Sequence, residues 1–215
     1  MDYQFVQNEK QKVIEWAQQM LSSDAVIVDL ETTGLNDAAI VQIGVLDISG
    51  EVLMDKLVKP GRPIPAGATR IHGITDEMVK DSPLLNDLYI EFSILLAGKI
   101  AISYNSDYEE RVIAGECHRR KLPLPKPLRW QCAMKKYAHF WGEWNPRRHS
   151  FAWQKLINAC RQQNITVNNA HNAADDCQMT LALIDSIGNN KFLSIRHDVP
   201  CFLCSRLMQT EDYPL

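Results

Sequence analysis

A short apolar, β-branched run at residues 25–28 is followed at once by acidic residues in the stretch "VIVDLETTGL". Such a run is typical of a buried central strand. Because side chains alternate across a strand, Asp29 and Glu31 project from the same face. Two carboxylates beside a core repel each other and lose hydration, which is unfavourable unless a cation or a donor lies between them. The sequence therefore predicts a sheet with a compensated acidic site at the end of its first strand.

The order of apolar patterns predicts strands first and helices later. Two strands that turn at residues 49–50 form a hairpin beside the first strand, and a Gly- and Pro-rich loop covers residues 61–67. One more strand is expected at 99–103, and helices are expected at about 7–21, 84–97, 107–120, 130–141, 151–163 and 173–187. This order favours an α/β fold in which helices flank a mixed β-sheet.

Length and composition favour a single domain. The 215 residues, of which 46% are hydrophobic, can bury one sizeable core. We expect this domain to span residues 1–190, with the helix at 7–21 packed on it and 191–215 as a C-terminal tail. An apolar run long enough to cross a membrane and a signal-peptide pattern are both missing from the sequence, so we expect a cytoplasmic protein that contacts no membrane. The cysteines are expected to be reduced thiols, at positions 117, 132, 160, 177, 201 and 204.

The net charge of −3 hides a basic segment. Residues 117–161 contain eleven Lys or Arg against one acid, Glu143, and four of the five tryptophans. Basic residues interleaved with aromatic ones suit a single-stranded nucleic acid, because phosphates attract cations and unpaired bases stack. Arg147 and Arg148 are the candidate phosphate contacts. The alternative is a solvated helical surface with its tryptophans turned inward.

Two later segments also carry acids that a sheet could bring towards the first strand. Asp176 lies at the edge of the apolar stripe of the last helix, where an unpaired carboxylate is costly, and His171 precedes it by five residues. In the middle of the chain, "SDYE" at 106–109 could be a helix-capping box between Ser106 and Glu109.

These segments follow one another as "DLETTGL", "YNSDYEERVI" and "HNAADD", with "IHGITDEMV" at 71–79 between the first two. In this order they resemble the DEDDh (DnaQ-like) family of 3′–5′ exonucleases. The resemblance runs from about residue 25 to residue 187, and the five-residue spacing from His171 to Asp176 fits the histidine branch. It implies a ribonuclease H-like fold, so that the domain at 1–190 would be an exonuclease domain.

The resemblance also implies two divalent cations, Mg²⁺ or Mn²⁺, held by four carboxylates, with His171 as the general base. The implied metal ligands are Asp29, Glu31, Glu109 and Asp176. The third ligand departs from the family pattern, which usually has Asp at the position of Glu109. By its spacing from Asn105, Glu109 is expected to be the ligand, and Asp107 is the alternative.

Family members seat the terminal nucleotide with the segment that follows the first acids. The resemblance therefore implies a substrate-binding role for a set of residues around the acidic site, in which Leu35 could wedge against the last base. The set is Leu30, Thr32, Thr33, Gly34, Leu35, His72, Asn105 and Tyr108.

We expect a metal-dependent 3′–5′ exonuclease that releases nucleoside monophosphates from single-stranded 3′ ends of DNA or RNA. The alternatives are an exoribonuclease that trims RNA 3′ ends, and a weakly active nucleic-acid-binding or polymerase-associated proofreading subunit. A homodimer and a polymerase partner are both left open. The tail contains His197, Cys201 and Cys204, which could supply half of a zinc site but not a closed one.

Overall fold

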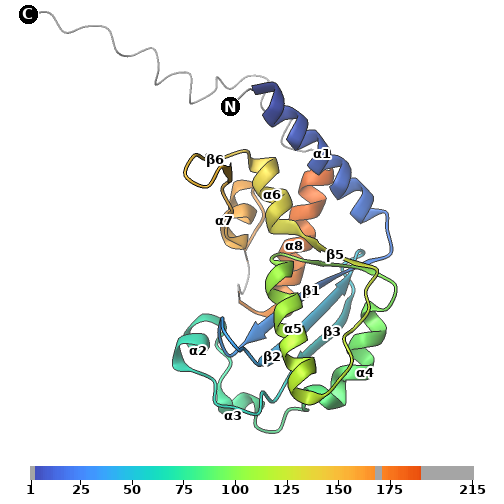
Figure 1. Cartoon of the computed structure of the whole chain (residues 1–215), viewed down its shortest axis with the longest axis vertical. Coiled ribbons are helices and arrows are strands. Elements are labelled where there is room, and N and C mark those ends of the chain that lie inside the picture. The colour runs from blue at the N-terminus through green and yellow to red at the C-terminus, as the bar shows by residue number, and fades with distance from the viewer. Residues whose placement is uncertain (1–2, 168–170, 190–215) are drawn as a thin grey trace, which may run out of the picture.

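The computed structural model describes residues 3–167 and 171–189, which form a five-stranded sheet with helices on both faces (Figure 1). The strand order is β3-β2-β1-β4-β5. β2 runs antiparallel to β1 and β3, whereas β1, β4 and β5 are parallel. The strands are β1 Ala25–Thr32, β2 Ile40–Asp47, β3 Val52–Leu57, β4 Ile100–Ser103 and β5 Arg129–Cys132. The predicted mixed α/β sheet is confirmed.

Alternate residues of β1 face two different cores. Ala25 and Ile27 pack with α1, α6 and α8, whereas Val26 and Val28 pack with α4 and α5. The same alternation turns Asp29 towards α8. The helices are α1 Tyr3–Leu21, α2 Ala66–His72, α3 Asp76–Val79, α4 Leu85–Leu96, α5 Ser106–Arg120, α6 Ala133–Trp141, α7 Leu156–Gln162 and α8 Ala173–Gly188.

The carboxyl ends of β1, β4 and β5 meet at one edge of the sheet, as parallel pairing requires. α5 begins three residues after β4, and α6 begins directly after β5. This edge of an open α/β sheet is where ligands commonly bind. The fold therefore brings the end of β1 and the start of α5 to the same place.

Two of the predicted helices begin later than expected. Residues 129–132 form the edge strand β5, because they find a parallel partner in β4, and α6 starts only at Ala133. The helix expected at 151–163 starts at Leu156, since Ser150–Phe151 (β7) pairs with Trp144–Asn145 (β6) in a small hairpin. The loop expected at 61–67 ends in α2, which begins at Ala66.

The four cysteines of the described ranges are buried and free, as predicted: Cys117, Cys132, Cys160 and Cys177. Within these ranges, no helix has the length and apolar character needed to cross a membrane. The predicted tail at 191–215, with His197, Cys201 and Cys204, lies outside the described residues.

Candidate active site

Three carboxylates predicted from two separate motifs meet at the carboxyl edge of the sheet. One oxygen each of Asp29, Glu31 and Asp176 lies within 4.8 Å of the others. Asp29 and Glu31 share one face of β1, and Asp176 belongs to the first turn of α8. The strand alternation and the placement of α8 together create the acidic cluster.

The start of α8 approaches the sheet closely at Gly44. A Cβ atom on Gly44 would lie 2.6 Å from the carbonyl carbon of Ala173, so only glycine fits. Two residues before Gly44 on β2, the side chain of Gln42 accepts a hydrogen bond from the Ala173 amide (3.3 Å). These two contacts fix how closely the start of α8, and with it Asp176, approaches the sheet.

Glu109, rather than Asp107, repels the carboxylates of this cluster, because Glu109 raises the pKa of Asp29 and Glu31 raises the pKa of Glu109. Glu109 is buried in the first turn of α5, and its Oε2 has no hydrogen-bond partner among the described residues. Asp107 has 61% of its side chain exposed and pairs with Lys135 (2.6 Å). The capping-box alternative fails because Ser106 is the first helical residue and Asn105 is the N-cap.

Burial raises the pKa of all four carboxyl groups, and repulsion from another member of the cluster adds to the rise for Asp29, Glu31 and Glu109. The pKa of Glu31 rises to about 8, mainly through burial and then through Asp176. The pKa of Glu109 also rises to about 8, mainly through burial, with Glu31 adding to the rise. Burial likewise raises the pKa of Asp29 and of Asp176. An array of carboxylate oxygens that repel one another, one of them without a donor, fits a hard divalent cation.

His171 lies immediately before the N-cap residue of α8. Its amide donates a hydrogen bond to Asp176 Oδ1 (3.2 Å), and its backbone has a positive φ of 71°. Burial lowers the pKa of His72, and electrostatic repulsion from His171 lowers it further. Since His72 Nδ1 accepts from the Ile74 amide (3.0 Å), His72 Nε2 is left to donate to the Thr32 carbonyl (3.2 Å).

The segment after β1 is held by hydroxyl groups. Tyr108 Oη donates to the Gly34 carbonyl (2.7 Å) and also contacts Thr32 Oγ1. Thr33 Oγ1 accepts from the Ala39 amide (2.9 Å), which closes the β1–β2 loop. Leu35, at the tip, has 75% of its surface exposed. The loop thus holds a large apolar side chain in solvent next to the acidic edge of the sheet.

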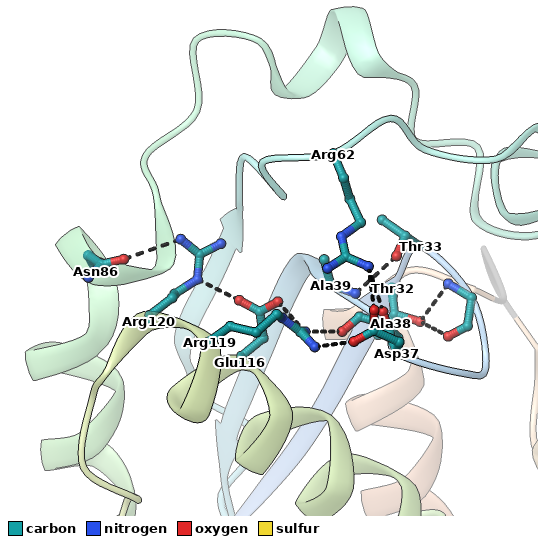
Figure 2. A network of polar contacts seen from close by, with 11 residues as sticks. Thr32, Thr33, Asp37, Ala38, Ala39, Arg62, Asn86, Glu116, Arg119 and Arg120 are labelled. Atoms are coloured by element: carbon teal, nitrogen blue, oxygen red, sulfur yellow. Dashed lines mark hydrogen bonds and ion pairs between the residues drawn. The ribbon is translucent and has the colours of Figure 1, made fainter.

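An ion-pair network fixes the other end of this loop (Figure 2). Arg119 donates to Asp37 Oδ1 (2.5 Å) and Arg62 donates to Asp37 Oδ2 (3.0 Å), although Asp37 has a positive φ of 44°. Buried Glu116 accepts from Arg119 and Arg120. Sequence reasoning missed this network, and its one local signal was the helical i, i+3 and i, i+4 spacing of Glu116, Arg119 and Arg120.

Among the described residues, no hydrogen bond or ion pair links three other predicted substrate residues to the acidic cluster. Leu30 is buried in the core formed with α4 and α5, so its side chain faces away from the acidic cluster. Arg147 and Arg148 are exposed in the β6–β7 turn, where their amides bond to Asn145 Oδ1 (3.0 and 3.2 Å). Within the described part of the chain, no ion pair neutralises either arginine.

A mixed sheet whose parallel strands end beside clustered carboxylates is the arrangement of ribonuclease H-like nucleases. Within that class, the chain belongs to the exonuclease family, whose RNase_T model matches residues 26–184. The DEDDh resemblance and the fold expected from it are confirmed, and the protein is an exonuclease.

Individual relatives agree with this assignment. The chain is 39% identical over 178 residues to the protein named uncharacterized exonuclease CP81 of Escherichia phage 186, covering 80% of this chain and 91% of that protein. The structure of exonuclease X in complex with 5′-overhanging duplex DNA is 28% identical, with a TM-score of 0.60, covering 78% of this chain and 92% of that one. The nuclease domain of 3′hExo, a DEDDh family member bound to rAMP, has the same fold at 16% identity, with a TM-score of 0.63 over 78% of this chain and 94% of that one.

Proposed function

We propose that this protein is a metal-dependent 3′–5′ exonuclease that releases nucleoside monophosphates from single-stranded 3′ ends of DNA or RNA. The single observation that carries the proposal is the meeting of Asp29, Glu31 and Asp176 within 4.8 Å. Buried Glu109 repels Asp29, and its Oε2 has no hydrogen-bond partner among the described residues. Repulsion between carboxylates that are removed from water is unfavourable unless cations bind between them. This repulsion supports the proposal that the carboxylates are metal ligands.

The four carboxylates would hold two Mg²⁺ or Mn²⁺ ions, which supply positive charge to the scissile phosphate and its leaving oxygen. His171 is exposed, its amide bonds to Asp176, and it would take the proton of the attacking water as general base. Thr32, Thr33, Gly34 and Leu35 would seat the terminal nucleotide, with Leu35 against its base. Tyr108 and His72 would hold that segment through Gly34 and the Thr32 carbonyl. Asn105 would support the seat from the start of α5.

Arg147 and Arg148 would bind phosphates of the incoming strand, since both are exposed and unpaired among the described residues. The cytoplasmic location belongs to the same proposal, because the four buried free thiols of the described ranges are typical of a reducing compartment.

The decisive assay compares matched DNA and RNA strands carrying the label at the 3′ or the 5′ end. With Mg²⁺ or Mn²⁺, the 3′ label should leave first as a mononucleotide, and EDTA should stop the reaction. Asp29→Asn is the control, because it removes one ligand and keeps the shape of the side chain, and it should lose at least about a hundredfold in rate.

Each alternative predicts a different result in this assay. Preference for the RNA strand would identify an RNA 3′-end-trimming enzyme. Strand binding with only trace hydrolysis would identify a weakly active or polymerase-associated subunit. Release of the 5′ label first, or hydrolysis that EDTA leaves unchanged, would contradict the proposed function.

A further inference from the structure

Trp153 is a large aromatic side chain that the fold leaves in solvent. Its exposed fraction is 59%, and no aromatic ring contacts it among the residues described. Trp144, on the neighbouring hairpin, is instead packed edge-on against Phe151, with ring centroids 5.6 Å apart. The two tryptophans therefore differ, since only Trp153 has its indole free of aromatic packing.

The backbone on both sides of Trp153 is fixed. The Ala152 amide donates to the Glu143 carbonyl (2.7 Å), and the Gln154 carbonyl accepts from Tyr104 Oη (2.8 Å). Gln154 also donates through Nε2 to Glu143 Oε2 (3.2 Å). Trp153 is therefore held in place and exposed by the surrounding backbone contacts.

Tyr104 connects this segment to the active-site edge of the sheet. It follows the last residue of β4 and lies five residues before Glu109. The residue after Trp153 thus accepts a hydrogen bond from Tyr104, which lies between β4 and α5. β4, which Tyr104 follows, lies on the opposite side of β1 from β2, whereas the Leu35 loop joins β1 to β2.

The charges around Trp153 favour a polyanion. Arg147, Arg148 and Lys155 are exposed and form no ion pair within the described ranges, and these three cations outnumber the one acid of the segment, Glu143. An exposed indole beside unpaired cations suits an unpaired base with its phosphates, because every base has a face that can stack. A base within a duplex has both faces covered and does not suit this surface.

We propose that Trp153 is a stacking platform for an unpaired base of the substrate strand upstream of the nucleotide being removed. This inference rests on the proposed function and adds to it a second contact point for the strand. It implies that the enzyme distinguishes strands with unpaired upstream bases from short or paired ones.

Strand binding tests the platform directly. Anisotropy of a labelled oligothymidylate, with Ca²⁺ in place of Mg²⁺, gives Kd for the wild type, Trp153→Ala and Trp153→Tyr. Removal of the ring should weaken binding by roughly 5- to 100-fold, and tyrosine should restore most of it. Ile90→Ala is the control, because Ile90 is exposed on α4 and has no part in the site. An equal Kd for the wild type and Trp153→Ala overturns the proposal.

Hydrolysis separates this inference from the proposed function. Trp153→Ala should lower kcat/KM for an oligonucleotide far more than for the p-nitrophenyl ester of thymidine 5′-monophosphate, which has no upstream base. Equal losses on both substrates would mean that Trp153 only supports the fold, and would overturn the platform. Failure of the wild type to hydrolyse either substrate with Mn²⁺ would contradict the exonuclease proposal, while the binding comparison would still decide the role of Trp153.

Discussion

Gly44 of β2 lies directly opposite Asp29 of β1, and the first residue of α8 occupies the space that a side chain on Gly44 would fill. Gly44, the residue opposite Asp29, therefore also lets α8, which carries Asp176, approach the sheet. One close backbone contact thus couples the sheet to the acidic cluster.

Gly44→Ala should displace the start of α8. The added Cβ would lie 2.6 Å from the Ala173 carbonyl carbon and 2.8 Å from the Ala174 amide nitrogen, so backbone must move. We expect the free energy of unfolding to fall by about 1–3 kcal/mol, and the initial rate of hydrolysis to fall by a larger fraction. Gly67→Ala is the matched control, because its Cβ would meet only the flexible end of Arg70 at 3.7 Å. Chemical denaturation and initial rates measure both effects; full activity of Gly44→Ala would contradict the coupling.

The middle motif can be decided with three variants. Glu109→Gln should remove most activity and weaken metal binding, whereas Asp107→Asn should change little, because Asp107 pairs with Lys135 in solvent. Glu109→Asp should retain or improve activity with Mg²⁺, which tolerates little distortion of its ligands. Single-turnover rates across a metal titration measure all three. If Asp107→Asn were inactive and Glu109→Gln active, Asp107 would be the ligand.

The ion pairs of Asp37 should matter for the substrate more than for stability. Asp37→Asn keeps the shape and tolerates the positive φ, but loses the charge that Arg62 and Arg119 bind. We expect KM for a strand to rise a few fold while the free energy of unfolding changes little, since Asp37 is exposed. Asp24→Asn, which breaks the exposed pair with Lys99, is the control. An unchanged KM would show that the loop holds its conformation without the network.

The metal-free protein should lose stability as pH rises. The folded-state pKa of Glu31 and of Glu109 is about 8, above the value near 4.5 for an unfolded carboxyl group. Between these values the folded site retains protons that the unfolded chain has released, so the stabilisation is complete below about pH 4.5 and is lost by about pH 8.

Melting curves in EDTA at several pH values test this behaviour, since about 1 kcal/mol corresponds to roughly 2–4 °C in Tm for a domain of this size. Mn²⁺ should raise Tm more at pH 8 than at pH 5, because it binds the ionised form. Glu31→Gln should reduce both dependences. A Tm difference between wild type and Glu31→Gln that is constant with pH would argue against a raised pKa.

Arg147 and Arg148 can be tested together through salt. If both contact phosphates, changing them to Ala should weaken binding of a single strand and reduce the slope of log K against log salt by about 1–2. The control is the double variant Arg70→Ala and Arg161→Ala, which removes the same number of positive charges. An unchanged slope would assign Arg147 and Arg148 to the solvated surface.

Much of the site could be predicted from the sequence because it depends on local geometry. Strand alternation is a property of the backbone, so Asp29 and Glu31 had to share a face. The spacing from Asn105 likewise favoured Glu109 over Asp107, and in the structure Glu109 is buried and repels Asp29 whereas Asp107 pairs with Lys135 in solvent. The order of these motifs along the chain was sufficient to identify the family.

Tertiary structure decided the features that depend on a distant partner. Residues 129–132 are a strand only because β4 lies beside them, and no local pattern distinguishes them from the start of α6. The contact between Gly44 and Ala173 joins residues far apart in sequence. Asp37 is bound by Arg62 and Arg119 only after β1, β2 and α5 have packed. The sequence by itself determined which residues carry the chemistry, whereas long-range packing determined what holds them in place, because such contacts form only once the whole sheet is assembled.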